Sequence, residues 1–299
     1  MTDVAGVVPA MSRQLRHFTF ALLSSRVDQA GRGTSLRHGV TGRVPGMRRE
    51  GDMSFVTGGD AEAVFASRRA WAAAIGVEAA GVVAARQVHG ARPARVTATD
   101  RGRGARSIDD AIPRTDALVT DEAGVPLLLC FADCAPLVFH DPVRGVAGLA
   151  HAGWRGAVAD VAGATVRAMV EGYGSAPRDI RTGIGPAIGP CCYRVGEDVA
   201  AAWRALAVDG DGVLRPAPGA GRQWLFDLPG ANRLLLRRAG LLDRHVEDAG
   251  ICTACRVDAY FSHRAEAGRA GRFAAIVALE SANTAEAWPS QQAAGGTES

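Results

Sequence analysis

Long uncharged apolar runs are absent from this sequence of 299 residues. The first residues, MTDVAGVVPAMSRQLRHF, contain no apolar stretch of signal-peptide length behind a basic start. No later stretch is long and uncharged enough to cross a bilayer as a helix. These absences argue against secretion and membrane insertion, so we expect a cytoplasmic protein without a membrane partner.

The sequence also has few cysteines and no large excess of positive or negative charge. Six cysteines are too few for a disulfide scaffold in a chain of this length, and the cytoplasm would keep them reduced. Each one is then a buried packing residue, a metal ligand or a nucleophile. The net charge is only +3 and the arginines are scattered, so no positive stripe predicts a nucleic-acid partner.

The composition is typical of a folded protein, because 47% of the residues are hydrophobic and the length allows a sizeable core. We expect a single catalytic domain at residues 17–285, between flexible polar tails at 1–16 and 286–299. A monomer and a homodimer are both compatible with the sequence.

Hydrophobic periodicity predicts a mixed α/β fold. Apolar residues recur at helical spacing over 60–75, and further helices are expected at 156–171 and 228–239. Short apolar runs bounded by Gly, Pro or Asp predict strands at 81–86, 125–131, 136–140, 146–150 and 273–279. Connections between 125 and 150 are too short for helices, so we expect a layered, mixed and partly antiparallel sheet flanked by helices.

Three segments place a metal-binding side chain at the end of a predicted strand: QVHG with His89, ADC with Cys134, and HAGWRG with His151. Imidazole and thiolate together suit zinc, and three protein ligands leave a fourth position for water or substrate. No compact spacing connects the three residues. Taken alone, they favour Cys134 as core packing and the histidines as structural hydrogen-bonding groups over a metal site.

The segment after His151 suggests an anion site. Gly153 and Gly156 bracket Arg155 at the expected start of a helix, where free backbone N–H groups attract anions. The Arg155 guanidinium would add a forked donor suited to phosphate. The alternative is a surface arginine beside a tight turn.

Two further segments carry cysteines. Residues 183–193 (GIGPAIGPCCY) have the glycines of a phosphate loop without its lysine, and predict a sharply turned loop that could wall a binding cavity. Cys252 and Cys255 form a CxxC pair, whose only near neighbours for a second pair are Cys191 and Cys192. We expect the CxxC pair to be buried packing.

The second half of 256–264 (RVDAYFSHR) alternates apolar and polar residues. This alternation is typical of a strand with one wet face, on which Ser262 and Arg264 would point the same way.

Taken in order, these segments resemble the YfiH family, also called laccase-domain or polyphenol-oxidase-like proteins. The family includes purine nucleoside phosphorylases and the peptidoglycan editing factor PgeF. The similar segments, in chain order, are RHGVTGR (37–43), RQVHG (86–90), TDALVT (115–120), FADCAPL (131–137), GLAHAGWRG (148–156), IGPAIGPCCY (184–193), FDL (226–228), YFSHR (260–264) and GRF (271–273).

The resemblance implies a zinc site whose ligands here are His89, Cys134 and His151. It also implies phosphorolysis of adenosine, inosine and methylthioadenosine to free base and ribose 1-phosphate, with adenosine deamination as a side activity. The implied fold is the layered α/β architecture related to the catalytic domain of cytotoxic necrotizing factors.

Residues for the substrates follow from the same segments. Arg155 is the first candidate to hold phosphate and Arg43 the second, while Gln87 and Arg264 belong to substrate-binding motifs. Asp133, beside Cys134, is our candidate for the carboxylate that moves protons in deamination, with a structural or ligand-positioning role as the alternative.

The sequence departs from the family pattern in two places. Residues 42–47 and 52–55 replace its usual Gly-Gly-Val-Ser-like turn and Asn-Leu segment, and Arg264 is followed by Ala265 rather than a second arginine.

Other functions are compatible with an open metal site. A hydrolase could use the metal or the Cys134 thiolate to cleave the amide of a wrongly made UDP-MurNAc-L-Ser, and a non-enzymatic metal-binding module is a further alternative. A multicopper laccase needs about ten histidine ligands, whereas this chain has 7 histidines in all. We therefore reject that reading, although copper could occupy the zinc site in vitro.

Overall fold

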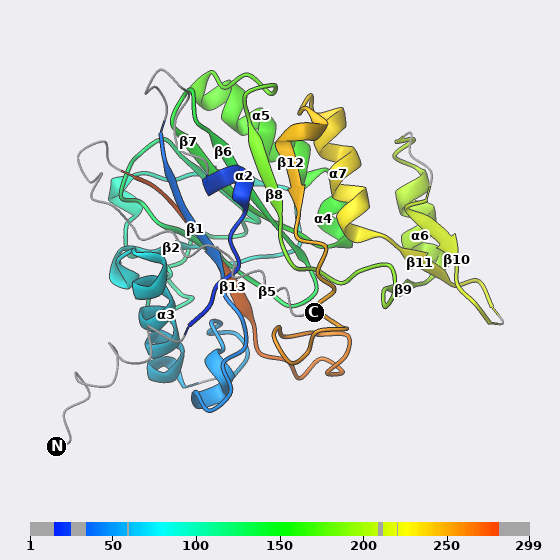
Figure 1. The fold of residues 1–299 in the computed structure, drawn as a ribbon, viewed down its shortest axis with the longest axis horizontal. Coiled ribbons are helices and arrows are strands. Elements are labelled where there is room, and N and C mark those ends of the chain that lie inside the picture. Colours follow the sequence, from blue (N-terminus) through cyan, green and yellow to red (C-terminus); the bar gives the residue numbers. More distant parts are fainter. Residues whose placement is uncertain (1–14, 25–33, 59, 209–211, 220, 281–299) are drawn as a thin grey trace, which may run out of the picture.

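The computed structural model describes residues 15–24, 34–58, 60–208, 212–219 and 221–280. Most of the predicted N-terminal tail and all of the predicted C-terminal tail therefore lie outside the described residues. Within these ranges the chain forms mixed α/β structure in packed layers (Figure 1).

Two mixed sheets form the centre of the molecule. The four-stranded sheet has the order β1-β13-β5-β2, with β1 (Leu36–Val40), β13 (Phe273–Leu279), β5 (Leu127–Phe131) and β2 (Val83–Ala84). The six-stranded sheet has the order β12-β8-β6-β7-β4-β3, with β12 (Val246–Asp248), β8 (Arg181–Ile184), β6 (Ala135–Asp141), β7 (Val146–Ala152), β4 (Ala117–Thr120) and β3 (Pro93–Arg95).

Antiparallel pairing dominates the centre of both sheets. β13 is antiparallel to both β1 and β5, and β6 is antiparallel to both β7 and β8. Parallel pairs occur toward the edges, where β2 joins β5, β3 joins β4 and β12 joins β8. The prediction of a mixed, partly antiparallel sheet is confirmed.

Apolar side chains from alternate strand positions create the layers. Leu118, Val138 and Leu149 from the six-stranded sheet pack in one cluster with Leu129 and Val277 from the four-stranded sheet, so the two sheets lie face to face.

The described helices lie outside the two central sheets. They are α2 (Ala21–Ser24), α3 (Ala61–Ile75), α4 (Trp154–Val158), α5 (Val161–Tyr173), α6 (Glu197–Arg204) and α7 (Leu228–Arg238). Trp71 and Ile75 of α3 pack on the four-stranded sheet. Met169 of α5 and Leu235 of α7 pack on the outer face of the six-stranded sheet, opposite α3 (Figure 1).

A small antiparallel sheet projects from this sandwich together with α6, at the right of Figure 1. It has the order β10-β11-β9, with β10 (Leu214–Pro216), β11 (Trp224–Phe226) and β9 (Arg194–Val195). Short 3-10 turns at Arg48–Gly51, Ala79–Gly81, Ala98–Asp100 and Asp243–His245 complete the regular structure.

The predicted helices at 60–75 and 228–239 are confirmed. Asp60 caps the first of these, α3, by accepting the N–H of Glu62, and Gly76 ends it in the left-handed conformation at φ 82°. The predicted helix at 156–171 is instead divided between α4 and α5. The helix is interrupted at Asp160, which has φ 60° and caps α5 by accepting the N–H of Gly163.

Two strand predictions need correction. The strand expected at 81–86 is reduced to Val83 and Ala84. Residues 256–264 form turns rather than a strand. The N–H groups of Ala259 and Tyr260 bond to the Arg256 carbonyl oxygen, whereas those of Ser262 and Arg264 bond to the carboxylates of Glu266 and Asp133. The bond from the Tyr260 N–H to the Arg256 carbonyl oxygen is 2.8 Å long.

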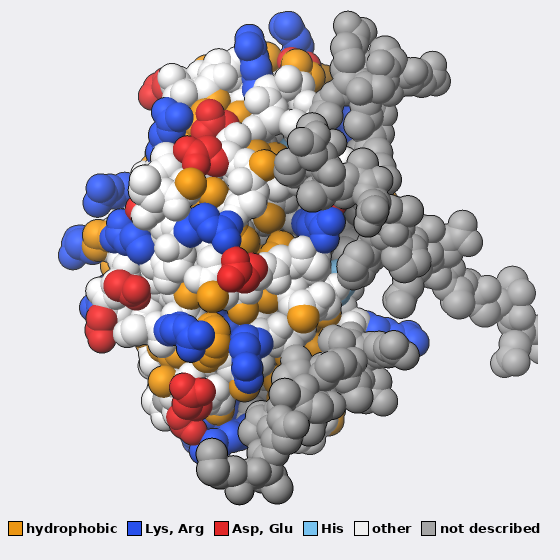
Figure 2. Space-filling model, turned by 90° about the vertical axis from the view of Figure 1, so that its left-hand side faces the viewer, with side chains coloured by type: hydrophobic (Ala, Val, Ile, Leu, Met, Phe, Trp, Pro, Cys, Tyr) orange, Lys and Arg blue, Asp and Glu red, His pale blue; other side chains and the backbone are white. Residues whose placement is uncertain are grey.

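The surface and the helices add two observations. Basic and acidic side chains lie interspersed on the face that Figure 2 shows, without a block of one sign. Among the described helices, none combines the length and the apolar character needed to span a bilayer.

Candidate active site

The three predicted ligand residues lie at neighbouring strand ends. Cys134 directly precedes β6, and His151 lies near the end of β7. Because Pro136 pairs with His151 across the two strands, the hairpin register places the thiol and this imidazole side by side. His89 follows β2 in a loop that crosses the same end of the sheet.

Their ligand atoms converge. One ligand atom from each of His89, Cys134 and His151 lies within 4.8 Å of those of the other two. The two imidazole rings meet edge to face, with centroids 4.9 Å apart. Gly153 must be small here, because a Cβ at that position would lie 2.6 Å from the Cys134 Sγ.

Asp116 supports this group from behind, and the sequence analysis did not assign it a role. Its Oδ1 accepts from the His151 Nδ1 at 3.0 Å and from the His89 N–H at 2.9 Å. Its Oδ2 accepts the N–H groups of Val88 and Gly90 at 3.0 and 2.8 Å. This carboxylate therefore orients one imidazole and holds the backbone of the other.

The loop around Asp116 explains an unusual backbone conformation. His89 has φ +60°, in the left-handed region that non-glycine residues seldom adopt. The three successive N–H groups on Asp116 stabilise that conformation and aim the imidazole at Cys134. Asp116 directly precedes β4, within the motif TDALVT, and no strand was predicted there.

Electrostatic coupling links the buried pair Cys134 and His151. Burial alone would raise the pKa of the Cys134 thiol, but the His151 charge and hydrogen bonds from both histidines lower the pKa to about 6. Burial alone would lower the pKa of His151, but Cys134 and Asp116 raise that pKa to about 9. The arrangement favours a thiolate, which is the form that binds metals.

The Asp116 carboxylate also stays ionised beside these groups. Burial would raise the pKa of Asp116, but the hydrogen bonds from His151 and from the Gly90 and Val88 N–H groups outweigh burial and lower it. A negative carboxylate behind a histidine fixes its tautomer and strengthens it as a ligand, as in many zinc sites.

The three residues line a cavity of about 540 Å³. That volume lies in the range of small-molecule sites. The walls include the predicted residues Gln87, Asp133, Arg155 and Arg264. Ile188 and Tyr193 come from the segment 183–193, which was predicted to wall a cavity, whereas Arg86, His263 and Arg272 are wall residues without a predicted role.

Asp133 is tied to the cavity wall by both carboxylate oxygens. Its Oδ1 accepts from the Thr253 hydroxyl at 2.7 Å, and its Oδ2 accepts the Arg264 N–H at 2.7 Å. Its backbone has φ +81°. These bonds suit a residue that positions the turn before Cys134, which was the alternative given for Asp133.

Gln87 and the two wall arginines differ in what they contact. The Gln87 amide forms a reciprocal pair with the backbone of Cys130, at 2.8 and 2.9 Å. Arg155 is exposed and stacks on the Trp154 ring at 4.3 Å. Arg264 donates to the Arg194 carbonyl oxygen at 2.7 Å. Arg155 therefore has the guanidinium that is freer to meet an anion.

Arg43 is not brought to this cavity. It does not appear among the lining residues. Its guanidinium forms ion pairs with Glu50 and Glu266 and stacks on the Phe261 ring at 4.3 Å. Glu50 lies near Arg43 in the sequence, whereas Glu266 comes from a distant part of the chain.

The glycine-rich segment 183–193 walls the cavity through Ile188 and Tyr193. The same segment carries Cys191 and Cys192, which meet Cys252 and Cys255. The prediction that the CxxC pair is buried packing is wrong for Cys255, which is exposed.

Comparison with known proteins follows the same segments. The model of the family described as multi-copper polyphenol oxidoreductase laccase matches residues 33–280. The purine nucleoside phosphorylase YlmD of Geobacillus stearothermophilus is 40% identical over 247 residues, which cover 82% of this chain and 88% of that protein. A purine nucleoside phosphorylase of Deinococcus radiodurans is 39% identical over 221 residues, covering 74% and 79%.

Solved structures agree with the fold. The crystal structure of YlmD from Geobacillus stearothermophilus superimposes with a TM-score of 0.78 at 37% identity and covers 85% of this chain and 98% of that one. The Bacillus licheniformis hypothetical protein YfiH also gives 0.78, at 34% identity, covering 82% and 93%. The predicted resemblance and fold class are confirmed, and the enzyme names of the relatives agree with an enzymatic function.

Proposed function

We propose that this chain, which belongs to the YfiH or laccase-domain family, is a zinc-dependent purine nucleoside phosphorylase. The observation that carries the proposal is the convergence of His89, Cys134 and His151 on one cavity with an arginine at its wall. Nucleosides such as adenosine, inosine and methylthioadenosine would be its substrates. We also propose a cytoplasmic location, on the expectations from the sequence.

The donor set fits zinc. Two imidazoles and one thiolate are borderline and soft ligands that suit this ion, and three protein ligands leave a fourth position open. Asp116 hydrogen-bonds the His151 Nδ1 and so leaves the Nε2 as its ligand atom. Zinc bound there would supply Lewis acidity and an activated water.

In phosphorolysis a phosphate oxygen forms a bond to C1′ of the sugar while the bond from C1′ to the purine nitrogen breaks. The base leaves with the electron pair and gains a proton, and the other product is ribose 1-phosphate. The sugar is cationic in the transition state, so the protein must hold phosphate close to C1′. Arg155 and Arg264 are the proposed phosphate-binding side chains, with Gln87 shaping the wall beside them.

The proposed side activity is deamination of adenosine. A water oxygen forms a bond to C6 of the base, the bond from C6 to the amino nitrogen breaks, and ammonia leaves after a carboxylate has moved the protons. His89, Cys134 and His151 would hold the zinc, which would supply the acidity that activates the water. Asp133 is the carboxylate that directly precedes a ligand, and its two hydrogen bonds to Thr253 and Arg264 favour a positioning role in phosphorolysis.

The histidine set does not favour a multicopper oxidase despite the family description. Among the residues that the structure describes, two groups of metal-binding side chains converge, and only one of them contains histidine. Two histidines and one cysteine cannot supply a three-copper cluster. Copper in the same site in vitro would be a substitute for zinc.

The test is incubation of the zinc-loaded protein with inosine, adenosine and methylthioadenosine, with and without phosphate. We expect phosphate-dependent release of free base and ribose 1-phosphate, and inosine from adenosine without phosphate if deamination occurs. Cleavage of UDP-MurNAc-L-Ser with no reaction of the nucleosides would replace the proposal with the amidase function.

Variants locate the reaction. His89→Ala and Cys134→Ala should abolish turnover, whereas the matched control His245→Ala, at the 3-10 turn before β12, should keep it. Unchanged turnover in the first two variants would leave a non-enzymatic metal-binding role for the site. Arg155→Ala should raise the KM for phosphate about tenfold, while Arg167→Ala, an exposed arginine paired with Asp160, should not.

A further inference from the structure

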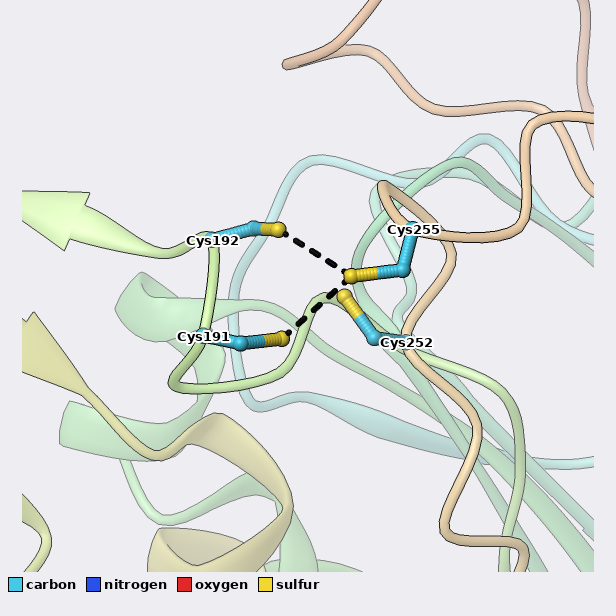
Figure 3. Close-up of side chains that lie close together, drawn as sticks. All are labelled: Cys191, Cys192, Cys252 and Cys255. Atoms are coloured by element: carbon cyan, nitrogen blue, oxygen red, sulfur yellow. Dashed lines mark hydrogen bonds between the residues drawn. The ribbon is translucent and has the colours of Figure 1, made fainter.

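Four cysteines from two distant loops meet outside the candidate active site. Cys191 and Cys192 lie between β8 and β9, and Cys252 and Cys255 follow β12. Figure 3 shows the four side chains pointing toward a common centre from opposite segments. All four sulfur atoms lie within 4.8 Å of one another, and the Cys255 Sγ is 3.6 Å from that of Cys191 and 3.4 Å from that of Cys192.

These separations match those of a tetrahedral metal site. Metal–sulfur bonds of about 2.3 Å in a tetrahedron place the sulfur atoms about 3.8 Å apart. The cluster is not a packing core, because Cys191 and Cys255 are exposed. Hydrogen bonds between thiols are weak and would not by themselves hold four of them together.

Backbone groups allow the four cysteines to approach one another. The Gly189 N–H donates to the Cys252 Sγ at 3.3 Å, which favours a thiolate there. A Cβ on Gly189 would lie 3.3 Å from the Cys252 Cβ and 3.4 Å from the Cys191 Sγ, so glycine allows the two loops to approach. A parallel bridge between Ala187 and Cys252 fixes their register.

We propose that Cys191, Cys192, Cys252 and Cys255 bind a second zinc ion in a closed, structural site. Four thiolates complete the coordination of the ion and leave no position for a substrate. The proposal rests on these sulfur positions and not on the reaction catalysed at His89, Cys134 and His151.

The site would brace one wall of the active-site cavity. The loop with Cys191 also carries Ile188 and Tyr193, which line the cavity. The segment with Cys252 continues through Thr253, whose hydroxyl bonds Asp133 beside the other metal site. A metal that joins the two segments would therefore hold the residues of both segments in place at the cavity wall.

The first test is metal content by mass spectrometry after purification under reducing conditions and loading with zinc. We expect two equivalents in the wild type, one in Cys255→Ser, one in His89→Ala and none in the double variant. Cys130→Ser is the matched control, since Cys130 is a cysteine outside both clusters, and it should keep two equivalents.

A second test uses cobalt. Cobalt added to the reduced wild-type protein should give strong thiolate-to-cobalt absorption for four thiolates, and His89→Ala should keep most of it. Native thiol titration of the zinc-loaded protein should find these four cysteines protected.

Several results would overturn the proposal. One is a wild type that binds one equivalent of zinc, which His89→Ala removes and Cys255→Ser does not. Another is free reaction of all four thiols in the zinc-loaded protein. A third is a disulfide among the four cysteines in protein kept under reducing conditions. Each result is independent of whether the protein cleaves nucleosides, so the two proposals fail separately.

Discussion

The two clusters of metal-binding side chains differ in how open they are. His89, Cys134 and His151 provide three ligand atoms at the edge of a cavity. Cys191, Cys192, Cys252 and Cys255 provide four sulfur atoms that face one another (Figure 3). In zinc proteins, three ligands with an open position are typical of catalysis and four cysteines are typical of structural support.

The two clusters also differ in what holds them. Cys134 and His151 belong to a strand hairpin, and Asp116 supports the histidines through three backbone N–H groups and one imidazole. Such a site is preorganised by the sheet. The four-cysteine cluster joins two loops, so a bound metal would contribute more to ordering those loops than it would to ordering the strand hairpin. If both proposals hold, the chain places its reaction at the rigid sheet and uses a second ion to hold the loops at the cavity wall.

The largest expected effect is on catalysis. His151→Ala should lower kcat/KM for phosphorolysis by about 1,000-fold, because loss of a metal ligand removes roughly 4 kcal/mol of transition-state stabilisation. Cys191→Ser should lower it only a few-fold, through a looser wall. Steady-state kinetics measure both, and equal losses would erase the distinction between the two clusters.

The next effect concerns local order. In Cys255→Ser, amides in segments 187–193 and 252–256 should exchange with solvent about 10–100-fold faster than in the wild type. In His89→Ala the same amides should stay protected. Hydrogen–deuterium exchange with mass spectrometry checks this, and unchanged protection in Cys255→Ser would show that the loops do not depend on the cluster.

The support of the open site can be tested through Asp116. Asp116→Asn should weaken zinc binding at His89, Cys134 and His151 by about 10–100-fold, because it removes the carboxylate behind both histidines. Asp141→Asn is the matched control. Asp141 is a buried aspartate that accepts backbone N–H bonds at the other end of β6. Competition with a chelator measures both affinities, and similar losses in the two variants would contradict a specific role.

The smallest effect is a difference in titration. With the metal removed, the Cys134 thiol has its pKa lowered to about 6, whereas burial and neighbouring thiols raise that of Cys191 to about 11. A lowered thiol pKa means that the reactive thiolate is present above that pH and lost below it. Alkylation of Cys134 should therefore rise around pH 6 and that of Cys191 only in strong alkali. His151→Gln should move the Cys134 midpoint upward, and equal profiles for the two cysteines would contradict the difference.

Local patterns predicted a large part of the fold. The helix at 60–75 has both a capping aspartate and a terminal glycine, and the apolar run at 273–279 forms the whole of β13. The strand predicted at 256–264 failed because alternation over a few residues does not supply a partner strand. Its backbone N–H groups instead bond within local turns or to the carboxylates of Glu266 and Asp133.

The site was predictable where strand ends carry the ligands. His89, Cys134 and His151 each follow or end a short apolar run, and the structure brings them together. Asp116 was missed because its role depends on the loop of His89 folding around it. Arg43 was misplaced because its partner Glu266 lies far away in sequence. Long-range pairings of this kind leave no local spacing to detect.

The place of β13 has a consequence for synthesis of the protein. This strand pairs with β1 on one side and β5 on the other, although it comes after both of them in the chain. During synthesis, the edges of β1 and β5 that face β13 therefore stay unpaired until residues 273–279 leave the ribosome. Unpaired strand edges can pair wrongly with other chains. Since Leu128 and Cys130 of β5 line the cavity, the binding cavity itself is finished only at that late moment of translation.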